Sequence, residues 1–184
     1  MKHMGTAELK TDRLILRRFT MKDTKAAYEN WMSDPKVTTY LTWPAHKNIK
    51  ITEQLLTMWI QKYEEPDFYQ WAIQLKENEE LIGNISVVNI NEKTDTVEIG
   101  YCMGQKWQHN GYMKESLENV IDFMTEKVKA LRVEARHDAE NTASGKVMKS
   151  CNMVYEGTLR QAGFNNRGIV DECVYSILSK ERIS

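Results

Sequence analysis

One stretch decides how this chain folds: Gly104-Gln105-Lys106-Trp107-Gln108-His109-Asn110-Gly111-Tyr112-Met113-Lys114-Glu115-Ser116-Leu117. It lies between residues 97–103, which alternate like a strand, and an apolar stripe at helical spacing from Met113 to Val128. The first amides of a helix lack partners within the helix and carry the positive end of its dipole. The segment from Gln105 to Leu117 therefore predicts a strand-to-helix junction that can hold a phosphate or pyrophosphate.

Gly111 gives this junction the freedom for a close approach between backbone and ligand. A Rossmann junction needs the spacing G-x-G-x-x-G, and a P-loop needs G-x-x-x-x-G-K-[ST]. Neither spacing is present in the stretch. Taken alone, the stretch fits a phosphate site and a plain loop-to-helix junction equally well.

The segments on either side predict a mixed α/β (α+β) domain with one central sheet. Strand patterns occur at residues 14–19, 71–75, 81–88, 97–103 and 131–135, and residues 154–159 and 173–178 predict a closing hairpin. Helices are expected over residues 20–34, 113–128 and 141–151, and in a segment with Ile51, Leu55, Met58, Trp59 and Tyr63 along one side. The strand-helix-strand order of residues 97–135 predicts a right-handed crossover between parallel neighbours. We expect a mostly antiparallel twisted sheet with a parallel central pair and helices on both faces.

Composition narrows the function classes. The 184 residues carry a formal net charge of −1, so no strong field attracts nucleic acid or an anionic membrane. The cysteines (Cys102, Cys151 and Cys173) form no C-x-x-C pair, and the four histidines form no cluster. No apolar stretch approaches the roughly 20 residues that span a bilayer. We expect no metal site and a cytoplasmic location, with residues 1–10 as an N-terminal extension that can include a cloning remnant and residues 11–184 as one domain.

Several motifs together resemble those of one enzyme family. Gln108-x-x-Gly111-x-Met113 resembles the Q/R-x-x-G-x-G/A signature of the GNAT (Gcn5-related N-acetyltransferase) superfamily. The likeness covers nearly the whole chain and is closest to the RimJ/RimL branch. The segments that carry it, in chain order, are Thr11–Arg17, Ser33-Asp34-Pro35, Tyr40-Leu41, Trp43-Pro44, Leu81–Ile85, Val97–Tyr101, Glu134–Arg136, Asn141–Ser144 and Tyr155–Arg160.

The resemblance implies a GNAT-like domain that uses acetyl-CoA as co-substrate. It implies direct acetyl transfer to a primary amine in a ternary complex, with a protein N-terminus as the leading acceptor. A small amine, such as an antibiotic or a polyamine, is the alternative acceptor, and a non-catalytic acyl-CoA-binding module is the third hypothesis. We expect neither nucleic acid nor membrane as a partner, while the C-terminal hairpin edge could support a homodimer.

The resemblance also implies roles for single residues. Glu98 is the candidate general base, and its alternative role is an ion pair with a residue such as Arg136. Ser144 is the candidate acid for the leaving thiolate, because Met148 stands where many GNAT enzymes have tyrosine. Asn141 is the candidate pantetheine contact, with helix capping as its alternative. The expected cofactor-binding set is Tyr101, Cys102, Met103, Gln108, His109, Asn110, Gly111, Tyr112, Met113, Asn141 and Ser144, with the backbone amide of Cys102 or Met103 facing the thioester oxygen.

For the acceptor we expect contacts from Tyr40, Trp43 and His46, which lie on a loop, where specificity commonly resides. Packing in the core is the alternative role for the aromatic residues.

Three positions depart from the family pattern. His109 stands where the branch often has Gly, and Met113 stands where the signature has Gly or Ala. The helical stripe predicts that Met113 turns into the core with Leu117 and away from the phosphates. Asn152-Met153 replaces the usual Gly-Phe pair, and Asn is the next-best residue after Gly for a left-handed helix cap, so we expect the same backbone route.

Overall fold

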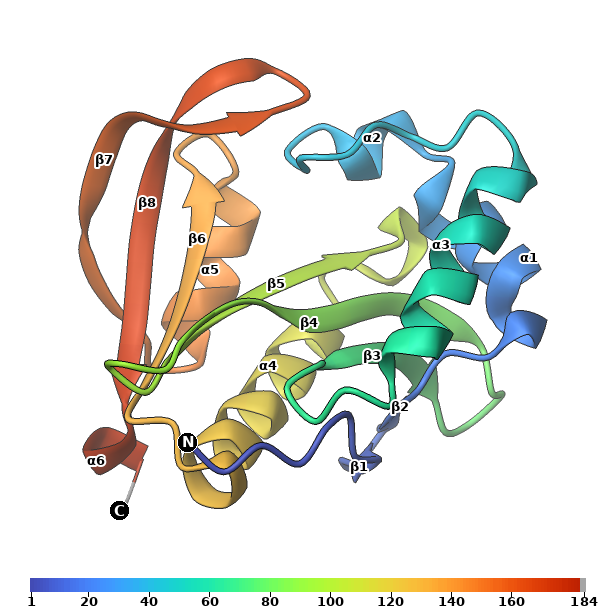
Figure 1. Ribbon diagram of the computed structural model, residues 1–184. Coiled ribbons are helices and arrows are strands. Elements are labelled where there is room, and N and C mark those ends of the chain that lie inside the picture. The colour runs from blue at the N-terminus through green and yellow to red at the C-terminus, as the bar shows by residue number, and fades with distance from the viewer. Residues whose placement is uncertain (183–184) are drawn as a thin grey trace.

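In the computed structural model, which describes residues 1–182, eight strands form one sheet (Figure 1). The strands lie in the order β1-β2-β3-β4-β5-β6-β8-β7. Their bounds are Leu9–Lys10 (β1), Leu14–Arg17 (β2), Gln70–Leu75 (β3), Leu81–Asn91 (β4), Thr96–Met103 (β5), Arg132–Asp138 (β6), Val154–Asn165 (β7) and Gly168–Leu178 (β8). The predicted strands are confirmed, and the closing hairpin extends further than expected.

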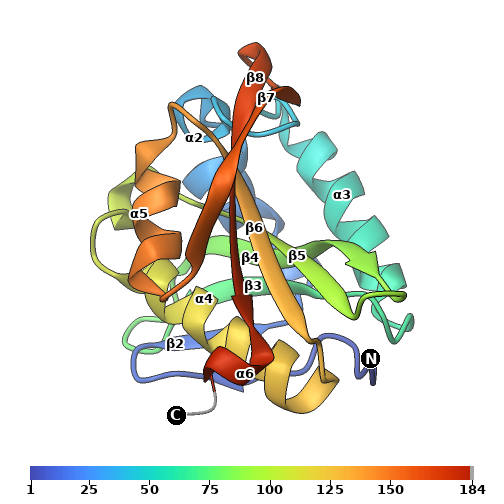
Figure 2. The same cartoon turned by 90° about the vertical axis from the view of Figure 1, so that its left-hand side faces the viewer.

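Helices cover both faces of this sheet (Figures 1 and 2). One face carries α4 (Tyr112–Asp122) and α5 (Thr142–Ser150), and the other carries α1 (Thr24–Ala27) and α3 (Ile49–Lys62). The shorter elements are η1 (Met21–Asp23), η2 (Tyr28–Met32), α2 (Pro35–Thr38), η3 (Gln105–Trp107), η4 (Phe123–Val128) and α6 (Ser179–Arg182). The predicted mixed α/β architecture is confirmed.

Within residues 1–182, β5 and β6 form the parallel pair of the sheet, and every other neighbouring pair is antiparallel. The parallel pairing runs from Thr96 opposite Arg132 to Ile99 opposite Ala135. Beyond that point β5 stays paired with β4 and β6 stays paired with β8. The two central strands therefore separate and leave one edge of residues 100–103 open.

A β-bulge lies where β5 leaves β6. The register between β4 and β5 shifts between Val87 and Asn89, which places Val88 against Gly100. A Cβ atom at residue 100 would lie 2.8 Å from Val88 Cγ1, so the bulge requires glycine there. The extra residue is Val88 of β4, so the bulge bends and twists β4 beside the point where β5 and β6 separate.

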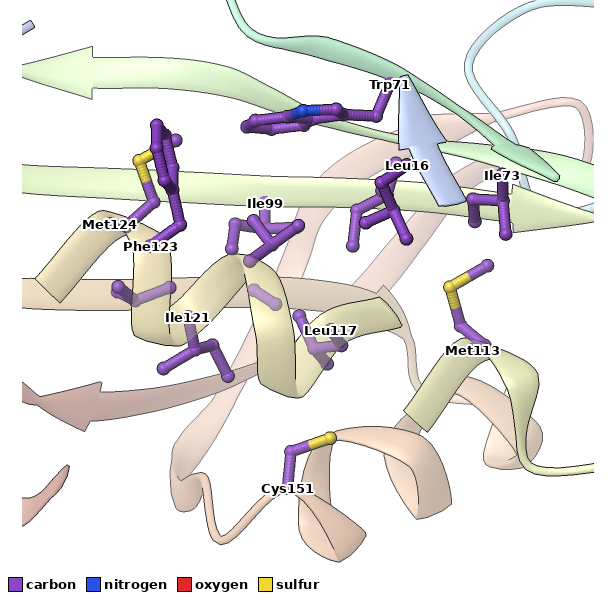
Figure 3. Close-up of a cluster of buried hydrophobic side chains, with 14 of the residues drawn as sticks. Leu16, Trp71, Ile73, Ile99, Met113, Leu117, Ile121, Phe123, Met124 and Cys151 are labelled. Carbon is purple, nitrogen blue, oxygen red and sulfur yellow. The ribbon is translucent and has the colours of Figure 1, made fainter. Parts of the chain in front are cut away.

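The apolar stripe of α4 and η4 forms the main core with the sheet. Met113, Leu117, Val120, Ile121, Met124 and Val128 are all buried, as their spacing predicts. Figure 3 shows Met113 and Leu117 beside Leu16, Ile73 and Ile99 of the sheet. Burial of such side chains contributes roughly 1.5–3 kcal/mol each to stability, so this stripe holds the start of α4 firmly beneath the sheet.

The predicted buried stripe of α3 is wrong in part. Ile51 and Met58 are exposed, whereas Thr52 and Leu56 are buried against the second core. Thr52 bonds to a buried histidine, His46, across the helix start, and this polar contact rotates the buried face by about one residue. The stripe rule counts apolar residues alone and so misses this contact.

The left-handed cap predicted at Asn152 is confirmed. Its φ is +61°, and its amide donates to Lys149 O at 3.1 Å while the amide of Met153 donates to Met148 O at 3.2 Å. These two bonds form a Schellman motif at the end of α5. Asparagine thus replaces glycine without changing the route of the chain.

Two properties of residues 1–182 bear on function. No helix in this range combines the length and the apolar character that crossing a bilayer requires. Among the same residues, no group of three His, Cys, Asp or Glu side chains is arranged to hold a metal ion.

Candidate functional site

A cavity of about 580 Å³ opens where β5 leaves β6. Its walls come from four places in the chain: α2 and the loop after it, the end of β5, the segment from Trp107 to Lys114, and the first turns of α5. The lining residues are Lys36, Val37, Tyr40, Leu41, Tyr101, Cys102, Met103, Trp107, Gln108, His109, Gly111, Tyr112, Met113, Lys114, Asn141, Thr142, Ala143, Ser144, Lys146, Val147 and Ser150.

The loop from Gln108 to Gly111 owes its shape to two left-handed residues. His109 has φ +65° and Gly111 has φ +79°. Left-handed backbone costs roughly 1–2 kcal/mol for a residue other than glycine, so His109 stores strain that the family's common glycine would avoid. At Gly111 the left-handed turn begins α4 directly, and the Glu115 amide donates to Gly111 O at 3.0 Å.

Side chains on both sides hold this loop in place. Gln108 Nε2 donates to Met103 O at 2.9 Å, and Asn110 Nδ2 donates to Trp107 O at 3.2 Å. From β2's side, Arg13 Nη1 donates to Asn110 O at 3.0 Å. The polar side chains of Gln108 and Asn110 are therefore engaged within the loop, and Asn110 lies outside the cavity lining.

Arg13 also braces the start of α4. Its guanidinium lies 4.5 Å from the centre of the Tyr112 ring and pairs with Glu115 at 2.7 Å. Thr11 Oγ1 donates to the same carboxylate at 2.5 Å. These contacts fix the direction of the first helical turn, whose amides face an incoming anion.

Met113 lies beneath the loop and is 7% exposed. Its side chain packs in the core with Leu117, so the prediction that it turns away from the loop's outer surface is confirmed. The first-turn amides of α4 stay accessible despite the large residue, because they use backbone groups and leave the side chain free to pack inward.

Three lysines line the cavity, and the sequence analysis missed all of them. Lys36 comes from α2, Lys114 from α4 and Lys146 from α5. They supply positive charge to a cavity that already contains a helix N-terminus. An extended anion such as a phosphorylated cofactor fits this combination of cations and unpaired amides.

Tyr101 and Ser144 join β5 to α5 across the opening. Ser144 Oγ donates to Tyr101 Oη at 2.9 Å, and Tyr101 Oη donates to Ser144 O at 3.2 Å. Burial raises the pKa of Tyr101, so its hydroxyl remains protonated. Asn141 Oδ1 accepts from the Ser144 amide at 3.3 Å and so caps α5, as its alternative role predicts.

Cys102 and Met148 are both buried. Burial raises the pKa of the Cys102 thiol to about 12, and the thiol lies 3.0 Å from Asn84 Oδ1. Such a thiol is unreactive near neutral pH. Met148 is 1% exposed and lies in the core, outside the cavity.

Glu98 lies on the other face of β5 from Tyr101, because successive side chains of a strand alternate. It is half-buried, and burial raises the pKa of its carboxyl group. Arg136 Nε lies 3.8 Å from Glu98 Oε2, so the ion pair named as the alternative role is present. Glu98 and Ser144 therefore approach the opening between β5 and β6 from opposite faces of the sheet.

Arg136 is shared by several carboxylates on this face. Its guanidinium lies 3.1 Å from Glu134 and 3.6 Å from Glu172, in addition to Glu98. Glu134 also pairs with Arg132, which pairs with Glu156 as well, so two arginines face four carboxylates. The face of the sheet that carries Glu98 has a net negative charge around these arginines.

The loop after α2 is held by the tip of the β7–β8 hairpin, which reaches over to it (Figure 1). Asn166 donates from its backbone to Leu41 O at 3.1 Å. Its side-chain Nδ2 donates to Thr38 O and to Trp43 O, each at 2.8 Å. One asparagine thereby fixes the cavity wall formed by residues 36–41.

Arg167 adds a second connection between hairpin and loop. It pairs with the buried Asp138 at 3.0 Å and lies 5.6 Å from the centre of the Tyr40 ring. Tyr40 lines the cavity, and its role as an acceptor contact stays a prediction. The hairpin tip therefore holds the loop after α2 from two residues, Asn166 and Arg167.

Trp43 and His46 lie elsewhere. Their rings pack against each other at 5.4 Å, and His46 Nδ1 lies 2.8 Å from Thr52 Oγ1. His46 is buried, and burial lowers the pKa of its imidazole. Both side chains lie outside the cavity lining, and they pack against each other instead.

The sequence-predicted residues thus divide into two groups. The structure brings together Tyr40, Tyr101, Cys102, Met103, Gln108, His109, Gly111, Tyr112, Met113, Asn141 and Ser144 around one cavity. Glu98, Asn110, Trp43 and His46 lie outside its lining. The three lysines and Asn166 belong to no motif in the sequence.

Comparison with known proteins assigns the family. The model described as "Acetyltransferase (GNAT) domain" matches residues 13–154, which is most of the chain. The chain belongs to the GNAT acetyltransferase family. It is 28% identical over 173 residues to the uncharacterized N-acetyltransferase p20 of Bacillus licheniformis, covering 94% of this chain and 97% of that protein.

The chain is also similar to two ribosomal-protein acetyltransferases, to one in sequence and to the other in fold alone. The ribosomal-protein-serine acetyltransferase of Escherichia coli is 28% identical over 108 residues, or 59% of this chain and 60% of that protein. RimL, a ribosomal L7/L12 alpha-N-protein acetyltransferase solved in complex with coenzyme A, has the same fold with a TM-score of 0.84 and 19% identity. That comparison covers 95% of this chain and 99% of RimL.

As a GNAT domain, the chain is an N-acetyltransferase, and GNAT acetyltransferases use acetyl-CoA. The cavity combines the start of α4 and three lysines with the open edge of β5.

The two left-handed residues of the loop yield a paired prediction about stability. His109→Gly removes backbone strain and is expected to raise the free energy of unfolding by up to about 1 kcal/mol. Gly111→Ala introduces the same strain and is expected to lower it by roughly 1–2 kcal/mol. Urea unfolding of both variants measures these changes, and a His109→Gly variant less stable than the parent chain would contradict the account of this loop.

Proposed function

We propose that this GNAT enzyme transfers the acetyl group of acetyl-CoA directly to the α-amine of a protein N-terminus. The observation that carries the proposal is the opening between β5 and β6, which has the loop from Gln108 to Lys114, our candidate for the phosphate contacts, on one face and Glu98 on the other. A donor and an acceptor can therefore reach the same point from opposite faces. The likeness to ribosomal-protein acetyltransferases supports a protein acceptor.

The phosphate end of acetyl-CoA would lie on the loop from Gln108 to Lys114. Amides of the first turn of α4 would bind the pyrophosphate. Lys36, Lys114 and Lys146 would add charge, and Asn141 would contact the pantetheine arm. The cofactor supplies the activated acetyl group, and the remaining chemistry belongs to the protein.

The thioester oxygen requires a donor as negative charge develops on it. The Gly104 amide donates to Ile82 O of β4 at 3.0 Å. Because alternate residues of a strand direct their amides to the same edge, we infer that the Cys102 amide also faces β4 and the Met103 amide faces the opening. Of the two amides considered from the sequence, Met103 is therefore the better donor.

Glu98 would remove the proton from the attacking amine, directly or through water. Burial raises the pKa of its carboxyl group while the charge of Arg136 lowers it, and the deprotonated carboxylate is the form that accepts the proton. An α-amine with a pKa near 8 is about one-tenth deprotonated at pH 7, whereas lysine with a pKa near 10.4 is almost fully charged. A carboxylate base therefore suits an α-amine better than a lysine side chain.

A small polycationic amine is the second candidate acceptor. The observation that favours it is the excess of carboxylates around Arg136 and Arg132, where four glutamates face two guanidinium groups. A molecule with several ammonium groups would gain from this charge in a partly buried cleft. A peptide with one charged N-terminus would gain less.

A panel of acceptors with acetyl-CoA tests the proposed function. It contains a lysine-free peptide with a free N-terminus, an N-terminally blocked peptide with one lysine, and spermidine. We expect acetylation of the first peptide at a rate at least tenfold above that of the blocked peptide. Faster turnover of spermidine would replace the leading acceptor by the second candidate, and an absence of turnover with all acceptors would reject both.

Substitution of Glu98 tests its role as base. In Glu98→Gln we expect kcat to fall about 10²-fold or more at pH values between the pKa of Glu98 and 8. In this range the parent enzyme has a deprotonated base, and the reaction requires both the amine and the base to be deprotonated. Above pH 8 free amine accumulates and the deficit shrinks. The acidic limb that the parent enzyme shows through the Glu98 pKa is expected to disappear from the pH–rate profile.

Glu156→Gln is the matched control for this test. Glu156 also lies in an arginine pair, with Arg132 at 2.6 Å, and hydrogen bonds from Arg132 and Ser176 lower its pKa to about 2. Glu156 is therefore charged throughout the pH range of the assay. The Glu156→Gln substitution is expected to leave the shape of the pH–rate profile unchanged. A profile of Glu98→Gln that matches this control would remove Glu98 from the role of base.

A further inference from the structure

The hydroxyls of Tyr101 and Ser144 form a closed loop of hydrogen bonds. Ser144 Oγ donates to Tyr101 Oη at 2.9 Å, and Tyr101 Oη donates back to the backbone oxygen of Ser144 at 3.2 Å. Both residues line the cavity where β5 leaves β6. In this arrangement the single hydroxyl proton of Ser144 points at Tyr101.

A leaving thiolate requires that proton to point elsewhere. A serine hydroxyl has one proton to donate and two lone pairs that accept. Ser144 cannot therefore serve sulfur while it donates to Tyr101. Met148, the residue one turn further along α5, is buried in the core and has no proton to donate.

We propose that Tyr101 is a positioning residue for the departing thiolate, because the two hydroxyls can exchange the direction of their hydrogen bond. In the second arrangement Tyr101 donates to Ser144 Oγ, and Ser144 donates to sulfur. This inference rests on the proposed function and assigns a role to a residue that touches sulfur only through Ser144.

The exchange requires rotation of two O–H bonds and no movement of heavier atoms. It gives up the bond from Tyr101 to the Ser144 carbonyl, which at 3.2 Å is the longer of the two. That carbonyl lies within α5 and keeps the helical partner four residues later. No buried polar group is therefore left without a partner.

The acetyl-transfer step balances with both hydroxyls intact. The amine nitrogen forms the C–N bond and loses its proton to Glu98 or to water. The C–S bond breaks, and its electron pair stays on sulfur. Tyr101 and Ser144 keep their own protons and stabilise this charge as a chain of two hydrogen bonds, in which each bond polarises the next. The thiolate gains its proton from solvent on release.

Burial of Tyr101 supports this role, because the tyrosinate form is strongly disfavoured and the residue remains a donor. A purely structural role, in which Tyr101 only joins β5 to α5, predicts a different result in the test below. It predicts a loss of stability and of cofactor affinity, without a change in the acidity of a bound thiol.

The test uses free coenzyme A and measures the pKa of its thiol in the complex. Ultraviolet absorbance of the thiolate is followed against pH, and the complex with desulfo-coenzyme A is the blank that subtracts protein tyrosinates and thiols. Burial raises the pKa of Cys102 and of Cys151 to about 12, so both stay protonated over most of the range. We expect the bound thiol of the parent enzyme to be more acidic than the free thiol.

In Tyr101→Phe the pKa of the bound thiol is expected to rise by about one unit, and kcat to fall about tenfold with KM for acetyl-CoA unchanged. Ser144→Ala is expected to raise the pKa of the bound thiol by at least as much. The double variant should match Ser144→Ala, because Tyr101 acts through Ser144. Ser144→Ala also keeps the test decisive if Tyr101→Phe fails to fold.

Tyr155→Phe is the matched control. Tyr155 forms a comparable hydroxyl pair with Thr158 Oγ1 at 2.7 Å on β7, outside the cavity. The Tyr155→Phe substitution is expected to leave the pKa of the bound thiol unchanged. Other titratable groups that face the cavity are common to all variants and cancel in the comparison: Lys36, Tyr40, His109, Tyr112, Lys114 and Lys146.

The outcomes separate two failures. If coenzyme A binds and its thiol has the same pKa in Tyr101→Phe as in the parent enzyme, the role of Tyr101 is overturned and the proposed function stands. If the parent enzyme does not bind coenzyme A, the proposed function itself fails.

Discussion

The active cavity exists because the parallel pairing of β5 and β6 stops at Ile99 and Ala135. In an ordinary sheet the next residues would pair, and the amides of residues 100–103 would have no free edge. Here the Val88 bulge of β4 lies against Gly100, beside the point of separation. The end of β5 gains an open edge, and α5 packs beside the gap with Asn141 and Ser144 in its first turn.

The rest of the site depends on this separation. Tyr101 bridges the gap to Ser144, and α4 begins at Tyr112, after the segment of residues 104–111 that follows β5, with its first residues lining the same cavity. The apolar stripe from Met113 to Val128 anchors that helix in the main core, so the binding end is rigid. The hairpin tip then fixes the remaining wall through Asn166. The cavity at the point where β5 and β6 separate is therefore lined by segments that lie far apart in the sequence.

Much of this arrangement could be predicted from the sequence where the signal is local. The strand order near the junction, the inward turn of Met113 and the left-handed cap at Asn152 follow from periodicity and from residue conformational preferences. What escaped prediction depends on distant contacts. Asn166 reaches residues more than 120 positions earlier, and the three cavity lysines meet only after α2, α4 and α5 are assembled.

The buried side of α3 was also predicted incorrectly, because it depends on a contact that apolar spacing does not show. Ile51 and Met58 have the spacing of a buried stripe, yet the polar pair of His46 and Thr52 determines which side faces the core. Apolar periodicity cannot report a buried hydrogen bond. The position of Glu98 was predicted from strand alternation, whereas its sharing of Arg136 with Glu134 and Glu172 required the neighbouring strands to be in register.

The most direct test of the central claim is a crystal structure of the chain with acetyl-CoA. The account predicts the pyrophosphate on the amides of Gly111 to Lys114 and the pantetheine arm in the gap beyond Ile99 and Ala135, with the thioester oxygen at the Met103 amide. Density for the cofactor on another surface, or a gap closed by pairing of residues 100–103 with β6, would contradict it.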